Sequence, residues 1–513
     1  MGLAKKFLTI SGLTVVSRVF GVVREALMLH FLGASVEMDA FTTAFKFPSF
    51  FRKFFAEGGF QSIFVPYYTD YISYSKHKSA KYFSSRIFML IFWIMLALSI
   101  VVHIFAKEFT LLMAPGFVKC PEKLALTIEF TRIIFPSIAF ISLSTVYSGI
   151  LLSRQKFFLY ALAPILTNII LVCSLFTFQD FTSAGRRLSY GTLLAGICQF
   201  LYMFFCVKYQ KLPSPRLSLV KLSPRMKMFL RKMIPVLAGA GVAQVNILVG
   251  MLFASFLQTG CITYLYCADR FIQLPLALFG ISMGTLLLPE IADKVATSHT
   301  DAIKDVTHKS ILFAMRMTLP SVAILAITGI YMVSLLYGHG KFDQSAVEST
   351  ANILTITAFG LPAFVISKIM SSILIAQKDT KTPFVAAITS IIANALFSTI
   401  LIKGFGVSGI AASATIAGYV NMTVICYKST GWFRMDKHVT KDIAKIFYSS
   451  GALFISMLIL KAQLGAVYSK LGELFFLSGL TLTGAIVYVL CLYFSKDAAI
   501  LNAIAYTRKR IGK

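Results

Sequence analysis

The sequence is poor in charged residues and has no long polar stretch. Only 14% of its 513 residues are Asp, Glu, Lys or Arg, and 57% are hydrophobic. A soluble domain of this length cannot bury that much apolar surface. Apolar stretches of roughly 20 residues, enough to cross a bilayer as a helix, recur along the whole chain. The composition excludes an ordinary soluble protein and predicts an all-α polytopic membrane protein.

Motifs for covalent or metal chemistry are also missing. No G-x-x-x-x-G-K-[ST] loop occurs, and the closest string, Gly338 to Phe342, is too short and lacks the hydroxyl. The seven histidines are dispersed without an H-E-x-x-H motif, and the eight cysteines form no C-x-x-C pair. We therefore expect no catalytic residue, no metal and no cofactor. The chain is predicted to be a transporter, driven by an ion gradient, the membrane potential or consumption of its product.

Acidic residues are scarce relative to basic ones, which gives a net charge of +28. The basic residues of the loops are concentrated in alternate connections, so the positive-inside rule puts both termini in the cytoplasm. The charge then reflects topology and contact with anionic lipids. A nucleic-acid partner is not expected, because the charge is spread over short loops without a basic domain.

About fourteen spans are predicted from apolar stretches of bilayer length. They cover residues 7–32, 38–66, 83–106, 124–152, 157–178, 188–208, 226–256, 262–292, 309–336, 349–376, 382–402, 407–428, 442–465 and 470–494.

An internal repeat organises these spans. A shift of 223 residues brings Ser148–Leu152 (SGILL) onto Ser371–Ile375 (SSILI), and Pro66 onto Pro289. We therefore predict two six-helix lobes related by a pseudo-twofold axis along the membrane normal, with a binding site between them near mid-membrane. Two additional helices follow the lobes. The predicted domains are 1–225, 226–430 and 431–513.

Charged residues lie inside three of the predicted spans. A charge facing lipid at mid-membrane costs roughly 2.5–3.5 kcal/mol, so these residues must pair within the bundle or face a hydrated cavity. Six basic residues stand against five acidic ones, which leaves a basic surplus suited to a polyanion. The set comprises Arg18, Arg24, Glu25, Asp39, Lys46, Arg52, Lys53, Glu57, Asp269, Arg270 and Glu290.

Arginine is the best side chain here for binding phosphate, because its planar guanidinium binds two oxygens at once. Arg18, Arg24, Arg52 and Arg270 are the ligand candidates, with Glu25, Glu57 and Asp269 as secondary ones. The alternative is that about half of the charged set forms ion pairs that only hold helices together. Glycines and prolines interrupt the same spans and are candidates for hinges or for close helix packing. They are Gly21, Pro48, Gly58, Gly59, Pro275, Gly280 and Gly284.

Four strings carry a family resemblance. They are SRVFGVVREA at 17–26, DAFTTAFKFP at 39–48, FRKFFAEGGFQSIFVP at 51–66 and YCADRFIQLP at 266–275. Together with the span count and the 6+6+2 plan, they resemble the MurJ (MviN) lipid II flippases of the multidrug, oligosaccharidyl-lipid and polysaccharide exporter superfamily.

The resemblance implies export of lipid II, the undecaprenyl-pyrophosphate-linked peptidoglycan precursor, to the outer leaflet of the bacterial plasma (inner) membrane. It implies a central cavity lined by Arg18, Arg24, Asp39, Arg52 and Arg270, an apolar groove on the last two helices for the lipid tail, and cell-wall synthesis proteins as partners. The alternatives are an exporter of other lipid-linked oligosaccharides or of amphipathic drugs, a membrane scaffold, and a membrane enzyme with an unrecognised carboxylate pair.

Overall fold

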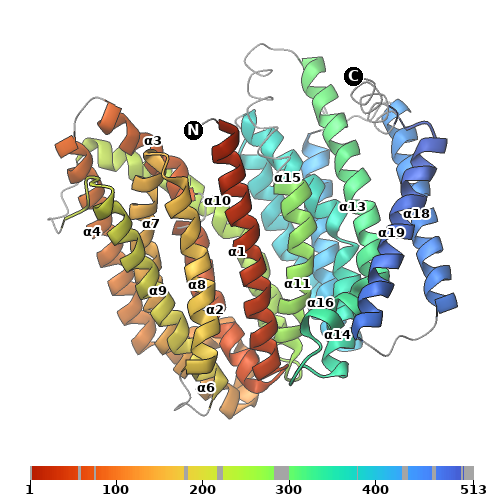
Figure 1. Ribbon diagram of the computed structural model, residues 1–513, viewed down its shortest axis with the longest axis horizontal. Helices are drawn as coiled ribbons and strands as arrows, with labels where there is room; N and C mark the ends of the chain where they lie inside the picture. Colours follow the sequence, from red (N-terminus) through yellow and green to blue (C-terminus); the bar gives the residue numbers. More distant parts are fainter. Residues whose placement is uncertain are drawn as a thin grey trace. The chain divides into compact units, whose positions relative to one another are not determined.

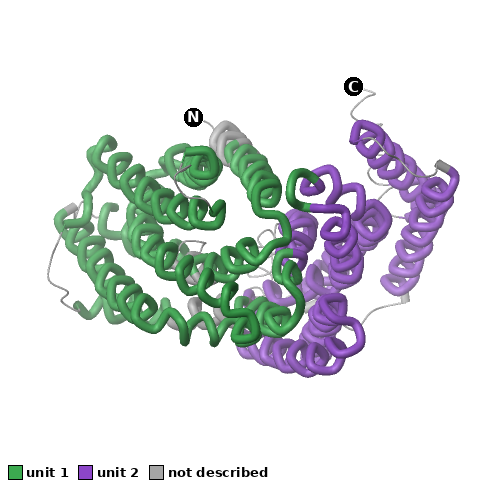
Figure 2. Tube along the Cα trace, turned by 90° about the horizontal axis from the view of Figure 1, so that it is seen from below, with its two compact units in different colours: residues 1–263, 339–342 green, residues 264–338, 343–513 purple. Residues whose placement is uncertain are grey.

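Helices are the regular elements of the computed structural model over the residues that it describes (Figure 1). These residues are 3–55, 59–73, 77–177, 183–216, 223–281, 300–377, 379–429, 437–464, 470–497 and 501. Some helical stretches within these ranges are described by their backbone alone. The chain divides into two compact units, coloured separately in Figure 2.

The first unit contains residues 1–263 and 339–342. Its elements are α1 (Leu3–Leu32), α2 (Val36–Phe55), α3 (Gly59–Ser73), α4 (His77–Ile104), α5 (Ala106–Met113), the 3₁₀ turn η1 (Pro115–Lys119), α6 (Pro121–Ile134), α7 (Ser137–Ser153), α8 (Phe157–Thr177), α9 (Ala184–Tyr209) and α10 (Pro224–Ala254).

The second unit contains residues 264–338 and 343–513. Its elements are α11 (Cys261–Pro275), whose first turn belongs to the first unit, the π-helical turn η2 (Leu276–Ile281), α13 (Thr300–Tyr337), α14 (Gln344–Ala358), α15 (Leu361–Ala376), α16 (Lys381–Lys428), α18 (Lys437–Leu464) and α19 (Lys470–Phe494).

Eight helices in the described part of the chain are long and apolar enough to span a membrane, or nine if the bent pair α14–α15 forms one span. One of them, α16, has 48 residues, about twice the length that a bilayer crossing needs. Gly406 interrupts it with φ 54° and ψ −130°, so two helices meet there. This break falls between the predicted spans 382–402 and 407–428. The chain is a helical multi-pass membrane protein, as its composition predicted.

Two predicted spans contain an interruption. The span predicted at 124–152 is interrupted beside Pro136, although α6 and α7 together still form one candidate span, Pro121–Ser153, and the span predicted at 349–376 bends by 47° between α14 and α15. Proline has no N–H for the helical hydrogen bond and crowds the preceding turn, which explains a break that apolar periodicity cannot reveal. SGILL and SSILI, the matched strings of the predicted repeat, lie late in the second helix of each pair.

The connection predicted at 107–123 is also more regular than expected. It contains α5 and η1, which are too short for a helical period to stand out from the sequence.

Aromatic side chains form much of the first unit's core. Phe60, Phe64 and Tyr68 recur every four residues on α3, so they share one face, and all three are fully buried. Ring centroids lie 5.1 Å apart for Phe60 and Phe64, and 5.4 Å apart for Phe64 and Tyr68. A Cβ added at Gly149 of α7 would lie 2.4 Å from Phe64 Cδ1, so only glycine permits this approach of α7 to α3.

The last two helices pack on α13 within the second unit. Leu453 and Met457 of α18 and Leu480 of α19 are fully buried in this contact. Beyond α19, Asp497 is completely buried and forms an ion pair of 2.8 Å with Arg316 of α13. Apolar packing and a buried ion pair therefore both attach α18 and α19 to the second unit.

Candidate functional site

Asp39 is buried and accepts four hydrogen bonds from three residues. It lies on α2 with 1% of its surface exposed. Its Oδ2 accepts hydrogen bonds from Lys123 Nζ of α6 at 2.9 Å and from the Gly260 N–H at 2.8 Å. Its Oδ1 accepts from the N–H and the hydroxyl of Thr263, at 3.1 and 2.7 Å. One carboxylate thus joins α2, α6 and the beginning of α11.

This arrangement has a simple electrostatic cause. The N–H groups of the first turn of α11 have no partner within their own helix, and the helix dipole makes that end positive. Asp39 accepts from two backbone N–H groups there, as an N-cap residue does, although it belongs to another helix. Asp39 thus forms an ion pair, one of the two roles open to the charged set, and its partner Lys123 lies just before the predicted span 124–152.

Arg24 is held between two helices. Its Nη2 donates to Glu25 Oε1 at 3.0 Å, and its Nη1 donates to Asn168 Oδ1 of α8 at 2.9 Å. Asn168 Nδ2 in turn donates to the Ser17 carbonyl of α1 at 3.2 Å. Over the described residues, the buried Arg24 Nε finds no hydrogen-bond acceptor. Arg24 is therefore fixed in place, and its Nε–H remains available to a ligand.

Arg18 lies six residues before Arg24 on α1 and is exposed. Val16, Val19 and Val23 are also exposed, at 42%, 56% and 45%, and their spacing puts them together on one face of α1. At 100° per residue, Arg18 points away from that valine face. Arg18 and these three valines therefore lie on different faces of α1.

Arg270 lies in the second unit, on α11. Its Nη2 donates to the Tyr266 hydroxyl at 2.8 Å, and its guanidinium carbon lies 4.6 Å from the centre of the Tyr266 ring. Both contacts orient the arginine from one turn earlier on the same helix. The neighbouring Asp269 accepts a hydrogen bond from Gln273. Tyr266 lies within the string YCADRFIQLP, but nothing in the sequence marks it as a partner of Arg270.

The structure does not describe the side chains of several residues that the sequence predicts to line the site or to act as hinges. Arg52 and Gly59 lie on α2 and α3, of which these parts are described by the backbone alone. Glu57, Gly58 and Gly284 lie outside the described residues, as do Pro289 and Glu290.

The described hinge candidates differ in their surroundings. At Gly21 an added Cβ would meet only Asn168 Nδ2, at an ordinary 3.9 Å, so packing does not demand glycine there. Pro48 lies inside α2. Pro275 ends α11, and the π-helical turn η2, which contains Gly280, follows at once. A π turn next to a proline is a common site of helix bending.

Arg18, Arg24 and Asp39 belong to the first unit, where Arg24 and Asp39 have separate sets of partners, and Arg270 belongs to the second. Their joint lining of a central cavity stays a prediction. The sequence analysis did not identify Lys123 as the partner of Asp39 or Asn168 as the partner of Arg24. A polar asparagine within an apolar span could have indicated Asn168, whereas nothing in the sequence indicated Lys123. Among the described residues, no group of three or more His, Cys, Asp or Glu side chains could hold a metal ion.

The long apolar helices define the class of protein: a multi-span membrane protein. Its fold matches that of an inward-facing multidrug resistance MATE family transporter of the MOP superfamily, with a TM-score of 0.67, 14% identity, and coverage of 86% of this chain and 98% of the other.

The chain belongs to the MurJ family, described as "Lipid II flippase MurJ", whose sequence model matches residues 28–484. A probable lipid II flippase MurJ of Rhizobium meliloti is 35% identical over 83% of this chain and 80% of its own length. One of Rickettsia prowazekii is 30% identical over 99% of both chains. A solved lipid II flippase MurJ in an inward closed conformation superposes with a TM-score of 0.80 at 28% identity, over 96% of this chain and 99% of the other.

Membership makes this chain a transporter of the bacterial plasma membrane. The alternative of an exporter of drugs or other lipid-linked sugars is not favoured. The sequence identity of this chain is 35% and 30% with the two relatives named for lipid II, but 14% with the MATE transporter.

Proposed function

We propose that this chain flips lipid II from the inner to the outer leaflet by alternating access. In this proposal Arg24, Arg52 and Arg270 bind the pyrophosphate and sugar head group in an inward-open cavity. The lobes then rock about the bound head group while the undecaprenyl tail stays in lipid. Arg18 and Asp39 set helix geometry or gate closure.

The arrangement of Arg24 is the observation that carries the proposal. A guanidinium within an apolar helix needs partners, and Glu25 and Asn168 accept from two of its nitrogens. The remaining buried Nε has no acceptor among the described residues. Leaving such a donor unsatisfied costs about 1–3 kcal/mol, so an arriving phosphate oxygen gains that interaction. Glu25 compensates one positive charge, and the dianionic pyrophosphate is matched by the other arginines.

Fourteen spans with both termini in the cytoplasm belong to the same proposal. The charged residues that α1, α2 and α11 carry suit spans that line a wet cavity. Reporter fusions at residues 76, 180, 340 and 513 test this topology. We expect 76 and 513 in the cytoplasm and 180 and 340 outside.

The last two helices offer a surface for the lipid tail. Phe475, Leu482 and Ile486 on α19 are 69%, 63% and 57% exposed, and Ile455 on α18 is 58% exposed. Apolar side chains in this position suit an isoprenoid chain, whose burial is favourable by about 0.8 kcal/mol per methylene.

The proposal includes an ion gradient or the membrane potential as energy source, no chemical change in the substrate, and contacts with anionic lipids and cell-wall synthesis proteins.

Flipping in reconstituted vesicles tests the ligand role. Arg24→Ala, Arg52→Ala and Arg270→Ala should each abolish translocation of lipid II, and Arg24→Lys should restore only part of it, because lysine lacks the planar fork. Arg132→Ala is the matched control, since Arg132 is an exposed arginine whose Nε donates to the His103 carbonyl at 3.3 Å.

A second comparison separates a ligand from a structural ion pair. Glu25→Gln removes the acidic partner of Arg24 but leaves the guanidinium. If Arg24 only holds helices together, Arg24→Ala and Glu25→Gln will lower flipping and thermal stability in parallel. The ligand role instead predicts that Glu25→Gln retains flipping under conditions where Arg24→Ala has none. Normal flipping by Arg24→Ala and Arg52→Ala together would refute the proposal.

A further inference from the structure

Basic residues greatly outnumber acidic ones at one end of the first unit. This end comprises the connection between α3 and α4, the turn between α7 and α8, and the stretch from the end of α9 to the beginning of α10. Residues 74–86, 150–160 and 205–232 contain fourteen lysines and arginines but no aspartate or glutamate. Those that the structure describes form no ion pair with another described residue, and neither does the exposed Asp70 of α3. The proposed topology puts this end in the cytoplasm.

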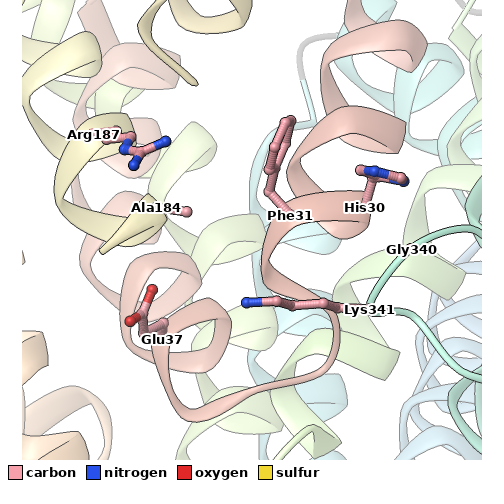
Figure 3. Close-up of a pocket in the computed structure, with 7 residues that line it drawn as sticks. All are labelled: His30, Phe31, Glu37, Ala184, Arg187, Gly340 and Lys341. Carbon is pink, nitrogen blue, oxygen red and sulfur yellow. The ribbon is translucent and has the colours of Figure 1, made fainter. Parts of the chain in front are cut away.

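Acidic residues accompany the basic ones at the opposite end of the same unit. Arg186, at the beginning of α9, forms a two-point ion pair with Glu129 of α6, at 2.6 and 3.1 Å. Figure 3 shows a pocket at that end, where Glu37 shares the lining with Arg187 and Lys341. The imbalance of charge is therefore larger at the cytoplasmic end.

Arg154 has an unsatisfied donor on this basic surface. It directly follows α7, and its Nε is buried without a hydrogen-bond acceptor among the described residues. Its guanidinium forms no ion pair with them either. A buried N–H normally has a partner in the protein, in ordered water or in a ligand. Because Arg154 as a whole is only partly buried, a ligand can reach its guanidinium from the surface.

The end of α7 does not need the Arg154 side chain as a cap. Leu151 O accepts from the N–H groups of Arg154 and Lys156, at 3.2 and 2.9 Å, and Leu152 O accepts from the Gln155 N–H at 2.9 Å. Gln155 adopts φ +57°, which lets the backbone turn back onto these carbonyls. The last carbonyls of the helix are thus satisfied by the backbone, which leaves the guanidinium without a structural task there.

A strap formed by residues 210–216 lies beside Arg154. The Tyr68 hydroxyl of α3 donates to the Pro213 carbonyl of the strap at 3.3 Å, and Arg154 is close enough to that hydroxyl to act on it electrostatically. The N–H of Arg216 donates to Ser85 Oγ of α4 at 2.9 Å. The strap is therefore fixed at both α3 and α4, and it holds further basic residues near Arg154.

Exposed aromatic side chains suit a position of this surface at the membrane interface. Phe158, at the beginning of α8, is 52% exposed, and Tyr209, the last residue of α9, is 84% exposed. The two helix ends lie together, since the Tyr202 hydroxyl donates to the Leu159 carbonyl at 3.0 Å. Aromatic side chains of this kind gather at the level of lipid head groups. The exposed Lys211, two residues after Tyr209, then lies at the depth of lipid phosphates.

We propose that Arg154 binds the phosphate group of a lipid in the cytoplasmic leaflet, with Lys156 and Lys211 adding positive charge around it. A guanidinium can bind two phosphate oxygens at once, and the free Nε–H together with a terminal N–H forms such a pair of donors. Basic residues at this surface also attract anionic lipids over a longer range. The phosphate belongs either to an anionic phospholipid or to the pyrophosphate of the lipid-linked substrate before it is flipped. The assignment rests on the proposed topology and function.

Lipid binding to the full chain in phosphatidylcholine nanodiscs tests the site. Phosphatidylglycerol and purified lipid II are titrated separately into Arg24→Ala protein with and without Arg154→Ala, so that the central arginines contribute less. We expect Arg154→Ala to weaken binding of one probe about tenfold, because a pair of charged hydrogen bonds is lost. Arg154→Lys should recover only part of it, since lysine lacks the planar fork. The probe that loses affinity identifies the source of the phosphate, and unchanged affinity for both overturns the proposal.

A matched control separates this site from the general charge of the surface. Arg231→Ala removes an exposed arginine of α10 at the same end and should bind both probes as before. If Arg231→Ala weakens binding as much as Arg154→Ala does, the effect is one of net charge and the proposed site is wrong.

Thermal unfolding in an uncharged detergent without added lipid separates binding from folding. Arg154→Ala should melt at the temperature of the parent protein, because its side chain has no hydrogen bond or ion pair to lose among the described residues. Phosphatidylglycerol or lipid II, whichever binds, should then raise the melting temperature of the parent more than that of Arg154→Ala. A lower melting temperature without lipid, with the same rise on adding it, would make Arg154 a structural residue and overturn the proposal.

The outcome is distinguishable from that of the proposed function. If Arg24→Ala still flips lipid II, the proposed function fails, yet a loss of phosphatidylglycerol binding in Arg154→Ala stands by itself. If Arg154→Ala binds both lipids normally while Arg24→Ala abolishes flipping, only the cytoplasmic phosphate site is refuted.

Discussion

Replacement of Asp39 by asparagine removes a buried charge from the point where three helices meet. Asparagine has one oxygen, and its best orientation directs that oxygen to Lys123 Nζ and the Gly260 N–H. Its amide nitrogen then faces the Thr263 N–H, donor against donor, which leaves a buried group unsatisfied at about 1–3 kcal/mol. Lys123, with 5% of its side chain exposed, also loses its counter-charge.

Loss of one partner from a buried ion pair costs about 3–5 kcal/mol, and we expect Asp39→Asn to fall in this range. The ring of Phe117, 5.2 Å from Lys123 Nζ, offsets only about 0.5–1 kcal/mol of that. Lys123→Met should cost less, because the Asp39 carboxylate keeps three donors at the positive end of α11. The double variant should cost less than the sum of the two single ones.

Equilibrium unfolding in mixed micelles measures these differences. Asp269→Asn is the control, since Asp269 is only partly buried and accepts from Gln273 of its own helix. The reasoning is refuted if Lys123→Met costs as much as Asp39→Asn, or if Asp39→Asn costs no more than Asp269→Asn. Either result would mean that the carboxylate does not stabilise the beginning of α11.

The remaining predictions concern packing and the last helices. Asp497→Asn breaks the buried ion pair with α13 and should lower the free energy of unfolding by about 3–5 kcal/mol, whereas Asp305→Asn, in an exposed pair, should lower it by less than about 1 kcal/mol in the same unfolding assay. Gly149→Ala forces a Cβ against Phe64 and should destabilise by about 1–3 kcal/mol. Gly451→Ala lies inside α18, where the added Cβ would have no atom within 4 Å, so it should instead stabilise by about 0.5–1 kcal/mol. A higher melting temperature for Gly149→Ala than for Gly451→Ala would contradict the packing described.

The fold class could be predicted because apolar stretches of bilayer length leave no soluble alternative. The breaks within spans could not, because they depend on local backbone choices at Pro136 and at Gly360, which hydropathy averages away. Predictions that charged residues would avoid lipid are confirmed for Glu25 and Asp39, which are buried at 6% and 1% exposure. Nothing in the sequence showed that Asp39 accepts four hydrogen bonds whereas Arg24 keeps an Nε donor without an acceptor among the described residues.

The sequence by itself determined the solvent of this protein and the residues that could not face it. A charge within an apolar stretch costs several kcal/mol in lipid wherever it occurs, so its position along the chain is enough to mark it. Only the tertiary structure decided which partner each charge has. Lys123 meets Asp39 from 84 residues away, and Asn168 meets Arg24 from 144 residues away. Such pairings depend on which helix faces touch, and packing of whole helices, not local sequence, settles that.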